Sequence, residues 1–102
     1  MNELPNEKII TAMEEMLKVA SDETRLKIMF ALLDEENKEK CVNEIYTLIG
    51  ASQSLTSHQL KVLKDVDLVA TRKEGTKIYY SLKDEHVAKL IEVVKEHVLE
   101  KM

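Results

Sequence analysis

Aromatic residues, glycine, proline and cysteine are all scarce in this chain of 102 residues. It contains four aromatic side chains, two glycines, one proline and one cysteine. With so few aromatics, the core must consist of leucine, isoleucine, valine and methionine. A single cysteine excludes an internal disulfide and fits a reducing compartment. Because no glycine- or proline-rich linker divides the chain, we expect one domain over residues 1–102, small enough for a partner subunit to help bury its apolar surface.

Long apolar runs and a basic excess are missing as well. The longest apolar run, residues 28–33, is far too short to span a bilayer, so no membrane association is expected. The first eight residues show no basic segment followed by an apolar one, which predicts a cytoplasmic protein. The net charge of −4 argues against nucleic acid, but residues 51–82 hold five bases and three acids, a local charge of +2 that leaves −6 for the rest.

The stretch from residue 52 to residue 64 has helical periodicity and an unusual polar side. Its apolar side carries Leu55, Leu60, Val62 and Leu63, with Thr56 and Gln59 among them. No carboxylate precedes Asp65 in this stretch. Short amide and hydroxyl groups suit base edges and lysines suit phosphates, so we expect this side to contact nucleic acid rather than to be an ordinary solvated surface. The residues on it are Gln53, Ser54, Ser57, His58, Lys61 and Lys64.

Two strand-like runs follow this helix, at residues 68–73 and 76–82. Ile78, Tyr80 and Leu82 alternate with polar residues, which is the period of a half-buried strand. Glu74 and Gly75 are expected to form the turn, since glycine tolerates positive φ. The hairpin tip then carries three bases, which are Arg72, Lys73 and Lys77. A helix with a short polar face followed by a basic hairpin predicts a winged helix-turn-helix, with the helix in the major groove and the hairpin on the neighbouring backbone.

The predicted fold is mainly α with a two-stranded β-hairpin and five helices. Ser21 is expected to cap the second helix, residues 34–40 to form an exposed charged loop, and Gly50 to end a helix that begins at residue 42. The predicted segments are a first helix within residues 1–20 with possible dimer contacts, a helix-turn-helix at 42–64, a wing at 68–82 and a last helix at 84–102.

At this point the chain resembles the ArsR/SmtB family of metal-responsive repressors. The segments that carry the resemblance are SDETRLKIMFALL, SQSLTSHQLKVLKDVDLV, RKEGTKIYYSL and the last helix. The family implies a cytoplasmic, homodimeric winged-helix repressor that binds operator DNA of two-fold character and is released by an inducing metal. Carried over residue by residue, its DNA contacts fall on Gln53, Ser54, Ser57 and His58, with the wing bases assisting.

Four residues of the last helix are candidate metal ligands, namely Asp84, His86, His97 and Glu100. His86 and His97 lie eleven residues apart, about 16 Å along a helix, so one helix cannot bring all four to one ion. An antiparallel copy of the helix can, which gives two equivalent sites per dimer. Two imidazoles and two carboxylates suit tetrahedral Zn(II), with Co(II) as a substitute. The family's zinc sensors carry the same D-x-H…H-x-x-E pattern. Taken singly, each residue also has a structural interpretation, as an N-cap or a solvated side chain.

Other interpretations remain open at the level of the sequence. The family's thiolate site is incomplete, because its CVC pattern reads Cys41-Val42-Asn43 here. A winged-helix regulator controlled by Cys41 oxidation, by a different metal or by no ligand is the alternative. A zinc enzyme is not expected, since no H-E-x-x-H motif occurs. A metal-storage protein would leave the polar helix without a role.

Overall fold

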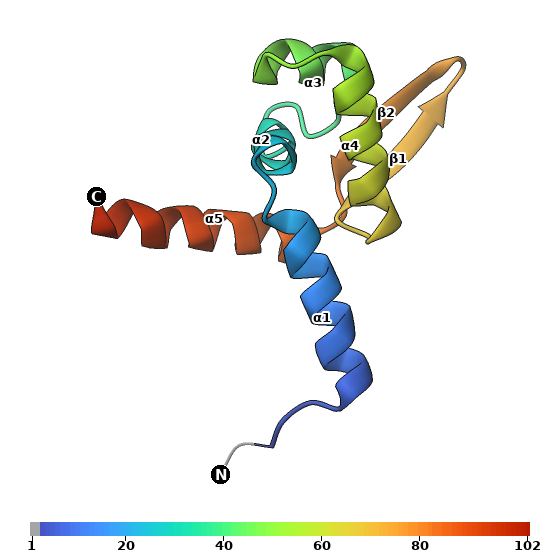
Figure 1. Cartoon of the computed structure of the whole chain (residues 1–102). Helices are drawn as coiled ribbons and strands as arrows, with labels where there is room; N and C mark the ends of the chain where they lie inside the picture. Colours follow the sequence, from blue (N-terminus) through green and yellow to red (C-terminus); the bar gives the residue numbers. More distant parts are fainter. Residues whose placement is uncertain (1–2) are drawn as a thin grey trace.

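The computed structural model describes residues 3–102, and within them the chain forms five helices and one hairpin (Figure 1). The first two residues of the predicted first segment lie outside the described part. The predicted fold class is confirmed. The elements are α1 (Glu7–Ala20), α2 (Glu23–Ala31), α3 (Val42–Ile49), α4 (Gln53–Asp65), β1 (Val69–Glu74), β2 (Lys77–Leu82) and α5 (Glu85–Lys101).

The core lies where α2, α3 and α4 meet, with β1 and the first half of α5 against it. Its buried hydrophobic side chains are all aliphatic or methionine, as the composition predicted. Leu60 and Leu63 of α4 have no exposed surface, and Thr56 of the same helix is equally buried. From α5, Val87 and Ile91 close one side. The burial of these residues fixes α4 with its apolar side inward, except that Leu55, which was predicted on this side, is 41% exposed in the first turn.

The boundary between α1 and α2 differs from the prediction by one residue. Asp22, rather than Ser21, caps α2 by accepting the Arg25 amide at 3.0 Å. Ser21 instead ends α1, where its hydroxyl donates to the Lys18 carbonyl at 2.8 Å. The aspartate is the better cap because its negative charge also faces the positive end of the helix dipole.

The hairpin turn also shifts by one residue. Glu74 still belongs to β1 and pairs with Lys77 of β2, so the turn residues are Gly75 and Thr76. Gly75 has a φ of 61°, which glycine adopts without strain. The alternation in β2 predicted a buried Ile78, but this side chain is 43% exposed because the tip of the hairpin extends beyond the body (Figure 1).

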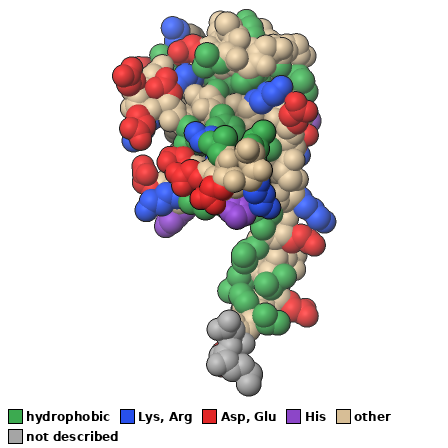
Figure 2. Space-filling model, turned by 90° about the vertical axis from the view of Figure 1, so that its left-hand side faces the viewer, with side chains coloured by type: hydrophobic (Ala, Val, Ile, Leu, Met, Phe, Trp, Pro, Cys, Tyr) green, Lys and Arg blue, Asp and Glu red, His purple; other side chains and the backbone are tan. Residues whose placement is uncertain are grey.

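α1 and the C-terminal half of α5 project from the body and expose apolar side chains. Figure 1 shows the two helices leaving the body in different directions, and Figure 2 shows hydrophobic side chains gathered along α1. Met13 and Leu17 of α1 and Val94 and Val98 of α5 are each about half exposed. A groove of about 520 Å³ with an almost entirely apolar lining lies between these helices and α2. None of the described helices has the combination of length and hydropathy needed to cross a membrane.

The prediction that residues 34–40 form an exposed loop is wrong for the last of these residues. Lys40 is only 4% exposed, and its backbone exchanges two hydrogen bonds with Tyr80 of β2, at 2.9 and 2.8 Å. Its ammonium donates to Asp34 Oδ2 at 3.1 Å and to the Asn37 carbonyl at 2.7 Å. A lysine can be buried in this way because its stem is apolar and two of its three donors are satisfied. The loop is therefore fastened to the wing.

We predict that Lys40→Met destabilises the chain by about 1 to 2 kcal/mol, because the Asn37 carbonyl and Asp34 lose their charged donor. Thermal unfolding at a fixed protein concentration measures the change. Lys38→Met is the matched control, since Lys38 lies in the same loop but is 67% exposed, and its ion pair with Glu85 is long, at 4.0 Å. Equal effects of the two substitutions would contradict the role given to Lys40.

The difference between the wild type and Lys40→Met also depends on pH. The hydrogen bond from Lys40 lowers the pKa of Asp34 below its ordinary value of 3.8. A carboxyl whose pKa is lower in the folded state than in the unfolded state stabilises the fold at pH values above its unfolded-state pKa. This stabilisation is lost as the pH falls through the folded-state pKa. The difference in free energy of unfolding between the wild type and Lys40→Met should therefore be largest at neutral pH and should decrease below about pH 4.

Candidate functional site

The polar side of α4 faces solvent. Gln53, Ser54, Ser57 and His58 are all exposed, while Thr56 and Leu60 of the same helix are buried. The hydroxyl of Ser52 accepts the Leu55 amide at 3.2 Å and so caps the start of the helix. The first turn carries no acidic residue. The exposed start of α4 therefore presents amide, hydroxyl and imidazole groups on a rigid element, without a carboxylate that would repel phosphate.

The two lysines of this side differ in their surroundings. Lys61 is paired with Asp65 at 3.1 Å, one helical turn further along. Both side chains are largely exposed, so the pair is weak and can exchange for a phosphate at little cost. Lys64 is exposed and lies in the last turn of α4. The basic part of the face is thus at the C-terminal end of the helix, away from Gln53 and Ser54.

The wing carries its three bases in two different situations. Arg72 Nε lies 3.0 Å from Glu39 Oε2, and Arg72 Nη1 lies 3.5 Å from Glu74 Oε2. The hydrogen bond to Glu39 raises the pKa of Arg72. The guanidinium also lies over the ring of Tyr79, 4.8 Å from its centre. Lys73 and Lys77 form no ion pair among residues 3–102, which leaves them as the freely available wing bases.

Glu39 is a functional candidate that the sequence gave no means of finding. It belongs to the loop of residues 34–40, 33 positions from Arg72. Arg25 was also missed, although a signal existed. It shares a helix face with Met29 and Leu32, both buried, and a charged residue on such a face calls for a specific partner. Its side chain donates to the Val19 carbonyl and to Gln59 of α4.

The four candidate metal ligands form two separate pairs on α5. Asp84 is the N-cap of this helix, and its Oδ1 accepts the Val87 amide at 3.2 Å. His86 Nδ1 lies 3.6 Å from the same oxygen. Near the other end, His97 Nδ1 lies 4.0 Å from Glu100 Oε2. Both imidazoles are exposed, and each pair lies on the outside of the chain.

One chain does not assemble a complete metal site from these pairs. Among the described residues, no group of three or more histidine, cysteine, aspartate or glutamate side chains is placed to hold an ion. The helix between the pairs keeps them apart, as the sequence predicted. The donor set of two imidazoles and two carboxylates nevertheless fits tetrahedral zinc. A second copy of α5 is required to bring four donors together.

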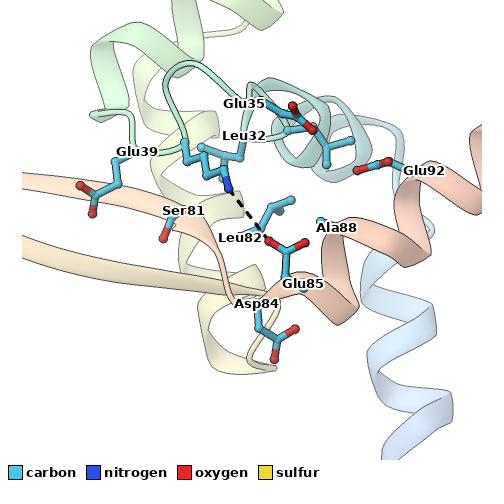
Figure 3. Close-up of a pocket in the computed structure, with 11 residues that line it drawn as sticks. Leu32, Glu35, Glu39, Ser81, Leu82, Asp84, Glu85, Ala88 and Glu92 are labelled. Carbon is cyan, nitrogen blue, oxygen red and sulfur yellow. Dashed lines mark ion pairs between the residues drawn. The ribbon is translucent and has the colours of Figure 1, made fainter.

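A second hollow, of about 480 Å³, lies between the loop of residues 34–40, the end of β2 and the start of α5 (Figure 3). Lys38 reaches across it to Glu85, at 4.0 Å. Asp84 lies at its edge, next to Glu85 (Figure 3). The same loop therefore contacts the wing through Lys40 and the start of α5 through Lys38.

Cys41 occupies the N-cap of α3. Its sulfur lies 3.4 Å from Glu44 Oε1, and its backbone amide donates to the same oxygen at 3.2 Å. This amide is the main reason that the pKa of Glu44 is lowered below the usual 4.5. The contacts describe a helix cap, and the chain contains no second cysteine.

Comparison with known proteins gives a consistent result. Residues 22–71 match the family described as bacterial regulatory protein, arsR family. A cadmium resistance transcriptional regulatory protein CadC homolog from Staphylococcus aureus is 43% identical over 77 residues, which cover 76% of this chain and 62% of the relative. The chain thus spans less than two thirds of that protein. The CadC protein of Listeria innocua is 42% identical over 85 residues, which cover 80% of this chain and 70% of the relative.

The fold is found in solved structures as well. The solution structure of a homodimeric winged helix-turn-helix DNA-binding domain from Mycobacterium bovis, a possible ArsR-family regulator, superimposes with a TM-score of 0.84. It is 29% identical, and the alignment covers 99% of this chain and 93% of that one. The resemblance seen in the sequence is confirmed. The chain belongs to the arsR family of bacterial regulatory proteins.

Proposed function

We propose that this chain is a metal-responsive transcriptional repressor that binds double-stranded operator DNA as a homodimer and is released by Zn(II). The observation that supports it most strongly is the exposed side of α4, with Gln53, Ser54, Ser57 and His58 beside a basic wing. No enzymatic activity is assigned to the chain.

The polar side of α4 supplies the proposed base contacts. Glutamine and serine both donate and accept hydrogen bonds, and their short side chains let the helix approach the base edges of a major groove. Lys61, Lys64 and the three wing bases are proposed to bind the phosphate backbone. In a two-fold dimer the two α4 helices read two half-sites, about 34 Å apart, so the operator has two-fold character.

The exposed apolar surface of α1 and α5 supports the dimer. Side chains such as Leu17 and Val98 are about half exposed in the single chain, and water contact with such a surface is unfavourable. A second copy that packs against both helices removes this surface from water. The M. bovis neighbour, which is described as homodimeric, supports the same assembly.

The two half-sites of α5 support zinc as the effector. In an antiparallel arrangement, Asp84 and His86 of one subunit meet His97 and Glu100 of the other, which gives two equivalent sites. A bound zinc ion would supply four bonds that join the two helices. Asp84 has two carboxylate oxygens, so its cap to Val87 and a metal bond are compatible. Operator affinity then falls by the free energy that couples the two sites, and DNA must weaken zinc binding by the same factor.

The alternative is the same DNA-binding regulator under a different signal. The staphylococcal relative is named for cadmium resistance, and cadmium is softer than zinc and prefers thiolates. Against it, this chain has a single cysteine, engaged in the cap of α3. Oxidation of Cys41 or the absence of any ligand would leave the proposed DNA interface unchanged.

The first prediction of this proposal is operator binding that zinc weakens. A labelled duplex, selected by the wild-type protein from a random pool, is titrated in fluorescence anisotropy with chelator and then with one zinc ion per subunit. We expect zinc to weaken binding about tenfold or more, which is about 1.4 kcal/mol of coupling. Co(II) should act alike, and acidification should weaken the response because a ligating imidazole must be neutral. A pool that yields no enriched duplex would contradict DNA binding, and binding that ignores zinc would leave the regulator without this effector.

The second prediction concerns the carboxylate that holds Arg72. Since Glu39 occupies the guanidinium, Arg72 must leave it to reach a phosphate. Glu39→Gln should therefore tighten binding to the selected duplex and steepen its salt dependence by about one phosphate contact. Glu36→Gln is the matched control, because it changes the net charge equally at an exposed position of the same loop. If both variants behave alike, Arg72 does not contact DNA.

The third prediction tests whether each metal site is shared between subunits. His86→Ala and His97→Ala homodimers both lack one imidazole in every site, so both should bind zinc weakly. In a mixed dimer, one site combines the intact His86 of one subunit with the intact His97 of the other. Mixing the two variants should restore tight zinc binding at one site per mixed dimer, measured with a competing chelator. No gain on mixing would show that the ligands do not meet across the dimer.

A further inference from the structure

Arg25 connects three helices through one side chain. Its backbone amide lies in the first turn of α2 and donates to the cap residue Asp22. Its Nε donates to the Val19 carbonyl of α1 at 2.7 Å, and its Nη1 donates to Gln59 Oε1 of α4 at 2.6 Å. The guanidinium is partly buried. A residue of α2 thus joins the end of α1 to the middle of α4.

The contact with α1 lies at the end of this helix that is attached to the body. Ala20, in the last turn, is the only buried residue of α1, and Met16 and Val19 are the residues that pack against the core. The Val19 carbonyl is one of the last four of the helix, which have no intrahelical partner. A guanidinium satisfies this carbonyl and also suits the negative end of the helix dipole. Arg25 therefore holds α1 at its hinge with the body.

The contact with α4 lies on the side opposite the proposed DNA contacts. Gln59 is half buried, while its neighbour in sequence, His58, is exposed. The guanidinium is planar and its donors have fixed directions, so a shift of the Val19 carbonyl changes the position in which Gln59 is held. No carboxylate lies within ion-pair distance of the Arg25 guanidinium in the part of the chain that the structure describes. The guanidinium donates to two neutral oxygens, the backbone carbonyl of Val19 and the side-chain amide of Gln59. This argues for a directional role rather than charge neutralisation.

We propose that Arg25 is a positioning residue that sets the orientation of α4 relative to α1. Since α1 carries part of the proposed dimer surface, a change in the dimer reaches the DNA-contacting helix through this guanidinium. The inference rests on the proposed function for its consequence, while the link between α1 and α4 stands on the geometry of this chain alone.

The DNA arm of the test compares Arg25→Met with Lys27→Met. Both remove one positive charge from α2, but Lys27 is 56% exposed and pairs only with Glu23. With the duplex selected by the wild-type protein, Arg25→Met should bind about tenfold more weakly, and its ratio of affinities without and with zinc should fall toward one. Lys27→Met should keep the wild-type ratio. A purely structural role would lower the folded fraction without changing this ratio.

Gln59→Met breaks the same link from the other end and serves if Arg25→Met does not fold. It should reproduce the loss of the zinc response, and the double variant should add nothing further, because the two residues act as one contact. Arg25→Lys keeps the charge and the capacity to donate but lacks the fixed donor directions of a guanidinium, so it should restore the response in part. A wild-type zinc ratio in both Arg25→Met and Gln59→Met would overturn the proposal. A salt dependence shallower by about one phosphate contact would also overturn it, since Arg25 would then bind DNA itself.

A second arm needs no DNA and separates the inference from the proposed function. Residual dipolar couplings of the backbone amides report whether two helices keep one relative orientation. In the wild type, α1 and α4 should fit a single alignment tensor; in Arg25→Met, α1 should require its own. A single tensor for the variant would refute the positioning role, even if the protein represses as proposed. Separate tensors, together with a wild-type protein that selects no duplex, would keep the link and remove the proposed function.

Discussion

The complete burial of Leu60 and Leu63 is the constraint on which the rest of the structure depends. Once these side chains and Thr56 face α2 and α3, the opposite side of α4 must face solvent, and that side holds the amide, hydroxyl and imidazole groups. The chain then continues into Leu68 and Val69, which are also buried, so the wing begins at a fixed place beside α4. The geometry of the proposed DNA surface is thus set by packing inside the core.

Charge neutralisation shapes this surface as much as its bases do. Lys61 is paired with Asp65, and Arg72 is held by Glu39 and Glu74, in a chain whose net charge is −4. A surface whose positive charge is reduced in this way would gain less from counterion release, so we expect its affinity for arbitrary DNA to be low. Recognition by such a protein depends on hydrogen bonds to bases and on the fit of two half-sites. With low non-specific affinity, a modest coupling free energy between zinc and the operator would be enough to release the protein from DNA.

The single chain carries half of each feature that the proposed mechanism needs. α5 separates the Asp84–His86 pair from the His97–Glu100 pair, and α1 and α5 leave apolar side chains in water. Both incomplete features involve α5. A partner that covers the apolar surface is therefore also the natural source of the missing ligands, and the Arg25 link would connect that partner to α4. This arrangement would place effector and DNA on different helices of one packed unit.

The sequence by itself determined the local features. The bounds of α3, the Gly50 C-cap, the two sides of α4 and the separation of His86 from His97 all follow from caps and helical period, which act over a few residues. Tertiary structure alone decided the burial of Lys40, the Arg72–Glu39 pair and the Arg25–Gln59 bond. Arg72 and Glu39 lie 33 residues apart in the sequence, and Arg25 and Gln59 lie 34 apart. Such contacts depend on how distant segments pack, because no periodicity relates their positions in the chain. Even the one-residue shift of the hairpin turn was decided by the pairing of Glu74 with Lys77 across the two strands.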